Sequence, residues 1–319
     1  MNARTGAGAV GDLSRRLQAP GPRYGEKFIQ GLLALCAVLS VLTTTVIVLS
    51  LLGPTIGFFE IVPASEFFFE VDWTPQFEPP SFGVLAIVAG TLNVALWAML
   101  FAIPIGLGAA IYLSEYATPR VRRTVKPVLE ILAGIPTVAI GIFAVTFILP
   151  EIIQPLWPGE LLGGVEKPFM ALAASLGIGL MVVPIIASIS EDAMSAVPRG
   201  LREGAYAMGA TRMKVATRVV FPAALSGIVA SVVLAISRAV GETMIVLIAG
   251  GSTPNATFLP NESIQAMTAY IAVTATGDIS TGSIDYKSVF AVGAVLFLLT
   301  LAMNLLSIRL VRKYREVYE

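Results

Sequence analysis

The stretch Glu203–Pro222, EGAYAMGATRMKVATRVVFP, lies between two long apolar segments of the chain. Small and apolar residues at helical spacing predict a short helix that ends at Gly209, followed by a basic helix from Thr211 onward. A helix, a glycine turn and a second helix are more structure than a plain connection between membrane segments needs. This loop, about residues 193–221, therefore either contacts a partner protein or lies as an amphipathic helix on the lipid surface.

The composition of the whole chain predicts a membrane protein. Apolar residues make up 56% and charged residues 13% of the 319 residues, and the mean hydropathy is +0.82, whereas a soluble domain carries roughly 25% charged residues. There is no histidine and only one cysteine, Cys36, so the commonest metal ligand and general base is missing. No GxxxxGK[ST] phosphate loop occurs, so the chain is not expected to hydrolyse a nucleotide itself. We therefore expect neither an enzyme nor a metal site.

Six segments are long and apolar enough to cross a bilayer, which takes about 20 residues. They are Phe28–Leu52, Phe82–Leu113, Val128–Leu149, Phe169–Ile189, Pro222–Ala249 and Val289–Val311. The predicted fold class is therefore all-α integral membrane with six transmembrane helices. Prolines inside three of the spans predict kinks. Residues 1–22, rich in Gly, Ala and Arg, are expected to form a disordered cytoplasmic tail, and residues 23–319 one six-helix transmembrane domain.

The basic residues predict the orientation. All 21 Lys and Arg residues except Lys167, Lys287 and Arg238 flank the same side of the spans, so both termini and the 193–221 loop are predicted to be cytoplasmic. The outer loops, about 53–81, 150–168 and 250–287, are acidic instead. This acidity is either the other half of an ordinary charge bias or the surface on which a partner docks.

The stretch Glu203–Pro222 resembles a known motif. Glu203-Gly204-Ala205 followed by Gly209, nine residues and Val219–Pro222 is similar to the EAA motif of ABC importer permeases, with Gly, Val and Phe at three variable positions. The resemblance implies a type I importer permease of the MetI-like fold, whose cytoplasmic coupling helix lies in a groove of an ATPase subunit. The residues it implies for ATPase coupling are Glu203, Ala205, Gly209, Ala210, Thr211 and Arg212.

Further segments between Phe82 and Ala272, among them IPIGLGAAIYLSEYATPRVRR and SRAVGETMIVLIAGG, resemble the permease subunits of phosphate importers, the PstC family. This chain departs from the family pattern at Ala86 and Thr137, where proline and serine are usual. The resemblance implies a heterodimer with a PstA-like permease, a PstB-like ATPase dimer that binds ATP and Mg, and a PstS-like phosphate-binding protein outside. It also implies the inner membrane of a prokaryote, no nucleic acid and no cofactor in this chain itself.

Two ionisable residues lie inside the fifth apolar segment. Arg238 and Glu242 are four residues apart, so on a continuous helix they share a face. A charge at the centre of the membrane costs at least about 2.5–3.5 kcal/mol, so it normally faces a bundle interior or a water-filled cavity. We predict that Arg238 contacts the permeating anion, because guanidinium donates paired hydrogen bonds to phosphate oxygens and stays charged. Glu242 is expected to balance its charge, and Ser237 and Thr243 to assist. The alternative is an intrahelical salt bridge that only fixes the helix.

Two other functions stay open on the sequence alone. A permease of the same class could carry another oxyanion, such as sulfate or molybdate, because the residues around Arg238 suit any tetrahedral anion. A stand-alone secondary transporter or channel could use Arg238 and Glu242 as a gate or proton relay, but the EAA-like loop would then have no purpose. Elsewhere, Lys126 and Glu130, which are four residues apart, are expected to form an ion pair at the membrane surface.

Overall fold

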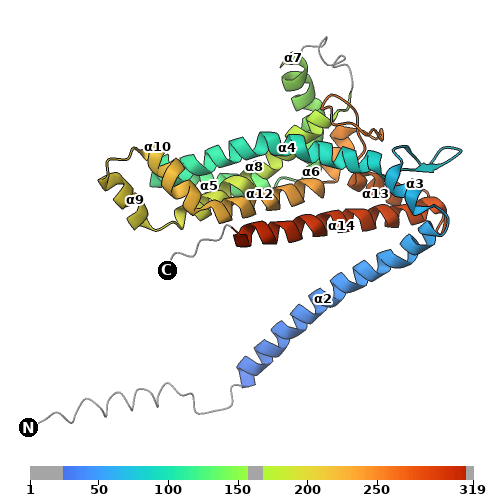
Figure 1. Cartoon of the computed structure of the whole chain (residues 1–319), viewed down its shortest axis with the longest axis horizontal. Coiled ribbons are helices and arrows are strands. Elements are labelled where there is room, and N and C mark those ends of the chain that lie inside the picture. The colour runs from blue at the N-terminus through green and yellow to red at the C-terminus, as the bar shows by residue number, and fades with distance from the viewer. Residues whose placement is uncertain (1–23, 157–167, 314–319) are drawn as a thin grey trace, which may run out of the picture. The chain divides into compact units, whose positions relative to one another are not determined.

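A computed structural model describes residues 24–156 and 168–313 of the chain (Figure 1). The predicted disordered tail lies outside these residues. The chain falls into two compact units, Met1–Ser50 and Leu51–Glu319, so the division lies within the first described helix. Nearly all regular structure is helical, with one two-stranded hairpin between the first two long helices.

The first described helix, α2 (Tyr24–Phe59), extends the predicted span Phe28–Leu52 at both ends. Its polar side chains fit an apolar environment because they bond to its own backbone. Thr43, Thr44 and Thr45 each donate a hydroxyl hydrogen bond to the carbonyl four residues before, at 2.8 to 3.0 Å. These bonds satisfy hydroxyl groups that would otherwise lack a partner in lipid.

Two further long helices form the centre of the second unit. α4 (Leu85–Ile111), extended by the π-helix η1 (Tyr112–Tyr116), packs along α8 (Ala171–Ser195). The contact is close because glycine occupies it: a Cβ on Gly106 would lie 2.8 Å from the Ile186 side chain, and one on Gly179 would lie 2.7 Å from the Phe101 ring. Small residues of this kind let membrane helices approach one another.

The third predicted span, Val128–Leu149, begins in the wrong place. The structure has α5 (Pro119–Ala133), a break at Gly134–Pro136, and then α6 (Thr137–Phe143), η2 (Ala144–Ile153) and α7 (Gln154–Leu156). The run that is long and apolar enough to span is Thr137–Leu156. The break follows from Pro136, which removes a backbone donor and disfavours helix at the residue before it. Glu130 therefore lies in α5, before this span.

The 193–221 loop and the fifth predicted span each consist of several short helices. α9 (Arg199–Ala207) and α10 (Arg212–Val215) lead through η3 (Ala216–Val220) and α11 (Phe221–Ala223) into α12 (Leu225–Val240), with a bend of 73° before α12. The predicted continuous helix Pro222–Ala249 is wrong, because the helix ends at Val240 and resumes only at Met244, ahead of η4 (Val246–Gly250).

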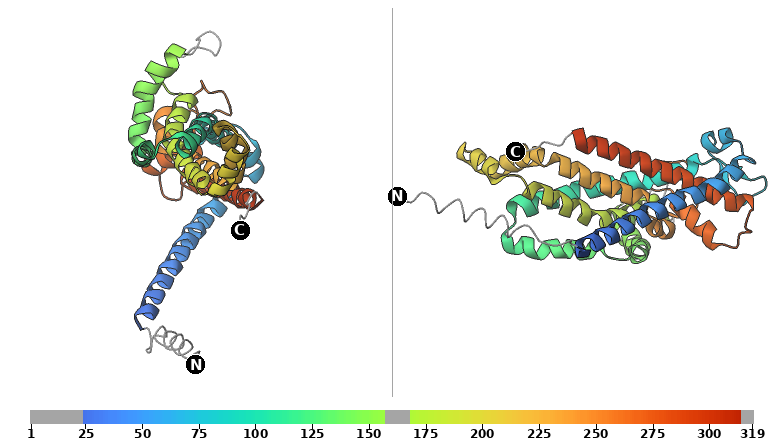
Figure 2. Two further views of the ribbon diagram at one scale, coloured as in Figure 1. Left: turned by 90° about the vertical axis from the view of Figure 1, so that its left-hand side faces the viewer. Right: turned by 90° about the horizontal axis from the view of Figure 1, so that it is seen from below.

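Two helices complete the second unit, α13 (Met267–Thr276) and α14 (Ile284–Lys313). Figure 2 shows α4, α8, α12 and α14 running side by side, in agreement with their packing contacts. Among the residues that the structure describes, five helices are long and apolar enough to cross a membrane, or six if the bent pair counts as one span. The all-α membrane fold is therefore confirmed, with one span bent.

Candidate substrate pathway and coupling site

The break between α12 and η4 is built from specific hydrogen bonds. Glu242 follows the last turn of α12, and its side-chain Oε1 accepts hydrogen bonds from the backbone N–H groups of Met244 (3.1 Å) and Ile245 (3.3 Å). The Thr268 hydroxyl of α13 donates to the Glu242 carbonyl oxygen at 2.7 Å. Glu242 is 8% exposed. Its carboxylate therefore satisfies N–H groups that begin the next helical segment and have no partner within it.

This geometry corrects the expected Arg238–Glu242 pair. The two residues are not on one continuous helix, because α12 ends at Val240 and Gly241 forms its C-cap. The Glu242 carboxylate bonds to backbone N–H groups, and no ion pair joins it to Arg238 in the described structure. Glu242 therefore caps a helix, and the role predicted for it as a counter-charge has no support in this geometry.

Arg238 lies in the last turn of α12 and its side chain is exposed. Within residues 24–156 and 168–313 it makes no hydrogen bond and no ion pair. The helix around it is apolar, and a cation in such a setting needs an anion, a carbonyl group or water. Its five N–H donors are thus all available to a group outside this chain.

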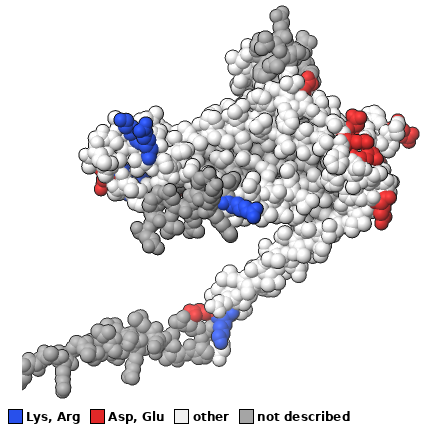
Figure 3. All heavy atoms as spheres, viewed as in Figure 1, with Lys and Arg blue, Asp and Glu red and all other residues white. Residues whose placement is uncertain are grey.

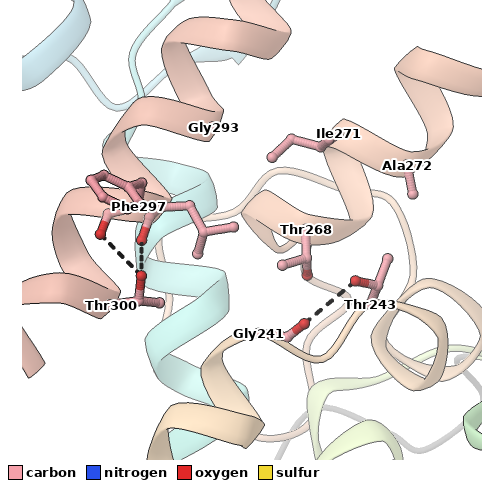
Figure 4. A pocket seen from close by; sticks show the side chains of 9 residues that line it. Gly241, Thr243, Thr268, Ile271, Ala272, Gly293, Phe297 and Thr300 are labelled. Atoms are coloured by element: carbon pink, nitrogen blue, oxygen red, sulfur yellow. Dashed lines mark hydrogen bonds between the residues drawn. The ribbon is translucent and has the colours of Figure 1, made fainter. Parts of the chain in front are cut away.

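A pocket of about 440 Å³ adjoins the break, a short distance along the chain from Arg238. Its residues come from three places, as Figure 4 shows: the break itself, α13 and α14. They are Gly241, Thr243, Thr268, Ile271, Ala272, Gly293, Leu296, Phe297 and Thr300. The walls are mostly apolar, and the three threonines supply the hydroxyl groups.

The three hydroxyl groups differ in what they already bind. Thr268 donates to Glu242, as described, and Thr300 donates to the carbonyls of Leu296 and Phe297 at 2.9 and 3.0 Å. Thr243 has only a 3.5 Å contact with the Gly241 carbonyl, which is a weak hydrogen bond. Thr243 is therefore the pocket hydroxyl best placed to donate to a ligand. The structure thus brings this predicted residue to the pocket.

Ser237, the other predicted pathway residue, is already bound elsewhere. Its hydroxyl donates to the Asn304 side-chain oxygen of α14 at 3.2 Å. Asn304 lies one turn beyond Thr300 on α14. The Ser237–Asn304 hydrogen bond between α12 and α14 therefore lies one turn of α14 away from the pocket residue Thr300. Sequence reasoning missed Thr268, Thr300 and Asn304. The spacing of Thr300 and Asn304, four residues apart in an apolar run, was the signal that could have found two of them.

The 193–221 loop has the predicted helix–turn–helix form. Gly209, with φ +80°, makes the turn between α9 and α10, and Thr211 caps α10 by accepting from the Lys214 N–H at 3.4 Å. A positive φ of this size suits glycine far better than residues with a Cβ atom. Of the residues predicted for ATPase coupling, Glu203, Gly209, Thr211 and Arg212 are exposed and Ala210 is half-buried.

Ala205 is placed differently from the prediction. It is buried in a cluster of the chain's own apolar residues, with Val197, Val215 and Val220. Its side chain therefore holds α9 against the loop and is not presented to a partner. Among the apolar side chains that the loop does expose are those of Tyr206, Met208 and Met213, and Met208 is 85% exposed. The EAA-like motif gave no signal for these three.

A buried ion pair ties α9 to two membrane helices. The Arg202 guanidinium donates to the Glu115 carboxylate of η1 at 3.0 and 3.2 Å. It also donates to the carbonyls of Met194 and Val197, at 2.7 and 2.6 Å, at the end of α8. Met194 lies in the last turn of α8 and Val197 follows that helix, so one side chain joins α9 to the ends of both central helices.

A second ionic cluster ties α5 to α8. Glu191, fully buried, forms ion pairs with Arg122 and Lys126 (3.1 Å) and accepts from the Ser195 hydroxyl at 2.7 Å. Lys126 also pairs with Asp192, so the ion pair expected between Lys126 and Glu130 is wrong. Burial lowers the pKa of Lys126, but hydrogen bonds and charges from Asp192 and Glu191 outweigh it and raise that pKa above its ordinary value. Glu191 is thus neutralised without a partner protein.

No group of three or more potential metal ligands occurs among the residues that the structure describes. The Arg238 guanidinium and the Thr243 hydroxyl group are hydrogen-bond donors of the kind that suit an anion.

Comparison with known proteins gives a consistent picture. The sequence profile of the family described as binding-protein-dependent transport system inner membrane component matches residues 102–316. The chain is 33% identical over 308 residues to the phosphate transport system permease protein PstC of Haemophilus influenzae, a match covering 91% of this chain and 94% of that protein. It is 34% identical to the probable ABC transporter permease protein YqgH of Bacillus subtilis, covering 77% of this chain and 76% of that protein.

Solved structures agree on the fold. A chain of the bacterial alginate ABC transporter, solved with an alginate-bound periplasmic protein, superposes with a TM-score of 0.61 at 16% identity, covering 92% of this chain and 98% of that chain. A chain of the inward-facing MetNI methionine transporter gives a TM-score of 0.54 at 21% identity, covering 71% and 94%. These likenesses confirm the predicted MetI-like permease fold.

Proposed function

Because the chain belongs to the family of binding-protein-dependent transport system inner membrane components, and within it to the phosphate-type ABC importer permeases, we propose that it carries inorganic phosphate across the membrane by alternating access. Its relatives are transport permeases and not enzymes. The chain is a multi-pass inner-membrane protein. The transported anion, the residues that meet it and the partner subunits are the parts that we propose.

The observation that carries the proposal is the unpaired Arg238 in the last turn of α12, three residues before the helix break whose pocket contains three threonine hydroxyl groups. Phosphate needs a cation that matches two oxygens at once, and guanidinium does this without losing its charge at any physiological pH. Thr243 adds a neutral donor from the pocket wall. Because Glu242 is held by backbone N–H groups, it does not neutralise Arg238 before the anion arrives.

A moderate affinity also follows from this arrangement. One arginine and one hydroxyl group hold an anion less firmly than a closed site with many donors, and transport requires that the bound anion can leave. Ser237 contributes by positioning α12 against α14 through Asn304. We therefore assign Arg238 and Thr243 as contact residues and Ser237 and Glu242 as residues that shape the pathway.

The working transporter has further subunits. Its relatives act in ABC transporters, and we propose a PstA-like permease as the second half of the pathway. A PstB-like ATPase dimer would bind ATP and Mg and receive α9, Gly209 and α10, and a PstS-like protein would deliver phosphate from outside. The exposed Met208 and Met213 suit contact with such an ATPase, because flexible thioether side chains adapt to an apolar groove.

The proposed orientation places both termini and α9–α10 in the cytoplasm, as the distribution of Lys and Arg indicates. In that orientation the acidic loops face outward. Free phosphate is repelled by nearby carboxylates within a Debye length of about 8–10 Å, so delivery by a binding protein is more effective than capture from solution.

An anion competition experiment tests the substrate. Proteoliposomes containing the complete transporter would import labelled phosphate in the presence of a 100-fold excess of sulfate, molybdate or arsenate. We expect only arsenate, which has the size and charge of phosphate, to compete. Competition by sulfate or molybdate at equal strength would reassign the substrate within the same class. Import without the ATPase subunit would instead indicate a secondary transporter and overturn the mechanism.

A further inference from the structure

The end of the bundle away from α9 and α10 carries a small folded cap, here defined as residues 58–84 (Figure 1). It contains α3 (Ala64–Phe69) and an antiparallel hairpin, in which β1 (Trp73–Thr74) pairs with β2 (Ser81–Phe82). The transport function proposed for this chain assigns no role to the cap.

An aromatic cluster fixes the cap to the bundle. The buried rings of Phe58, Phe67, Trp73 and Phe82 contact one another edge to face, with centroids 5.3 to 6.4 Å apart. Trp73 also contacts the Tyr270 ring of α13 at 4.8 Å. Edge-to-face pairs of this kind add to the stability that burial gives, so the cap is a rigid platform.

Backbone hydrogen bonds also hold α3 and the hairpin of the cap together. The N–H of Gly83 donates to the Asp72 carbonyl at 2.8 Å, and the N–H of Val84 donates to the Phe67 carbonyl at 2.9 Å. A Cβ atom on Gly83 would lie 2.4 Å from the Glu70 carbonyl carbon, so only glycine lets the two chain segments approach this closely. The position of α3 relative to the hairpin is thus fixed by main chain as well as rings.

Two large aromatic side chains stand outside this core. Phe69, at the end of α3, is 79% exposed, and Phe77, in the hairpin loop, is 71% exposed. Exposed phenylalanines on a rigid support are unfavourable in water, and aromatic residues are enriched among those that contribute most to protein–protein binding. The platform therefore presents two apolar anchors to something that covers them.

The charged residues of the cap itself are all acidic, and no lysine or arginine occurs in residues 28–119. They are Glu60, Glu66, Glu70, Asp72 and Glu78. At the base of the cap, the Lys287 ammonium of α14 donates to the Gly57 carbonyl at 3.3 Å. Figure 3 shows acidic side chains gathered at this end of the bundle. Carboxylates repel the anionic headgroups of a membrane surface. A protein whose contact face carries lysine and arginine around an apolar recess is the complementary occupant.

The cap is shared with a phosphate permease. The match with the phosphate transport system permease of Haemophilus influenzae covers 91% of this chain and therefore extends across residues 58–84. The family profile, in contrast, begins at residue 102, after the cap.

We infer that the cap is the docking surface for the phosphate-binding protein, with Phe69 and Phe77 as anchors and the surrounding carboxylates as the charged rim. This inference rests on the proposed function and adds the site at which the partner binds. The anchors supply affinity, and the acidic rim speeds association and makes it sensitive to salt.

The test uses the complete transporter and the phosphate-loaded binding protein of the same organism as the probe. Binding is titrated with the transporter in nanodiscs of zwitterionic lipid at low and high salt. We expect Phe69→Ala with Phe77→Ala to raise Kd about tenfold or more, as loss of two anchors does. The triple change Glu70→Gln, Asp72→Asn and Glu78→Gln should slow association at low salt and flatten the salt dependence.

Controls separate docking from folding. Phe258→Ala removes an exposed ring from another loop and should leave Kd unchanged, while Phe69→Leu keeps an apolar anchor and should retain most of the affinity. In proteoliposomes, phosphate uptake by the Phe69/Phe77 variant should recover at saturating binding protein, because only docking is impaired.

Two results would overturn the inference: an unchanged Kd in a correctly assembled Phe69/Phe77 variant, or a defect that appears only when the bilayer contains anionic lipid, which would assign the rings to the membrane. If the intact transporter binds its partner through these rings but imports no phosphate, the docking surface stands and the proposed substrate falls.

Discussion

The Arg202 guanidinium donates two hydrogen bonds to one oxygen of Glu115, at 3.0 and 3.2 Å, while also donating to the carbonyls of Met194 and Val197. The two charged groups are largely buried, with side-chain exposures of 17% and 5%. The pair therefore joins α9 to the ends of α4 and α8. We predict that a movement of α9 reaches the membrane helices through this contact.

Loss of the pair should separate ATP hydrolysis from transport. Arg202→Met removes the cation from Glu115, which keeps only the Ser114 hydroxyl at 3.0 Å, and removes the bonds to both carbonyls. Each hydrogen bond to a charged group contributes about 1.5–3 kcal/mol. We expect phosphate import per ATP hydrolysed to fall about tenfold, with hydrolysis by the ATPase subunit largely kept. Parallel assays of uptake and phosphate release measure both quantities.

Two further variants test whether the effect comes from the contact between Arg202 and Glu115. Arg199→Met changes an exposed arginine at the start of α9 and should leave the ratio unchanged. Glu115→Gln combined with Arg202→Met should be no worse than Arg202→Met alone, because both act through one contact. Additive losses would show that the residues act separately.

Glu242 should behave as a helix cap. Glu242→Gln keeps a carbonyl oxygen that can accept from Met244 and Ile245, whereas Glu242→Ala removes the acceptor, at a cost of about 1 kcal/mol. We expect the Gln variant to keep most transport and the Ala variant to lose both thermal stability and transport. Equal, severe loss in both variants at normal stability would restore a role for the negative charge.

The Lys126 cluster should stabilise the protein in a pH-dependent way. Because the pKa of Lys126 is raised above its ordinary 10.5, its contribution is fully present below the unfolded-state pKa and is lost as pH rises through the folded-state pKa. Lys126→Met should therefore lower the unfolding temperature at pH 8, and the difference from the intact chain should shrink above about pH 10.5.

Arg123→Met is the matched control for Lys126, since Arg123 lies on the same helix and forms no ion pair in the described part of the chain. It should change the unfolding temperature little at any pH. A Lys126 effect that stays constant from pH 8 to about pH 11 would show that packing, and not charge, carries it.

Met208 should anchor the ATPase subunit. Met208→Asp places a charge on the most exposed apolar side chain of the loop and should lower the amount of ATPase that co-purifies with the permease, whereas Met208→Leu should keep it. Retention of a full complement of ATPase by Met208→Asp would exclude Met208 from the contact.

The structure also shows which features the sequence could predict. Hydropathy located the spans because each needs a long run of apolar residues, and the turn at Gly209 followed from a residue that tolerates positive φ. The break after Val240 left a weaker signal, because Gly241 at the C-cap of α12 has no positive φ and no proline marks the break. It is held by a carboxylate on backbone N–H groups and by Thr268, a residue 26 positions away. Tertiary hydrogen bonds of this kind override local helical preference.

The sequence also did not predict which charged residues form ion pairs with one another. Lys126 and Glu130 have the spacing of a helical ion pair, yet Lys126 bonds to Glu191 and Asp192 on α8. Sequence spacing within one helix says nothing about acids on a neighbouring helix. The same limit applies to Ala205, whose motif position suggested an exposed contact but whose small side chain fills the loop's own core.

The central claim is that Arg238 meets the transported anion, and uptake by an Arg238 variant tests it most directly. Cells without their own high-affinity phosphate system would express the complete transporter with the intact chain, Arg238→Gln or Arg238→Lys, at matched surface levels. We expect phosphate uptake to be lost in the Gln variant and to persist at a raised KM in the Lys variant, which keeps the charge but not the paired donors. Normal uptake by Arg238→Gln would show that the arginine is structural and would contradict this assignment.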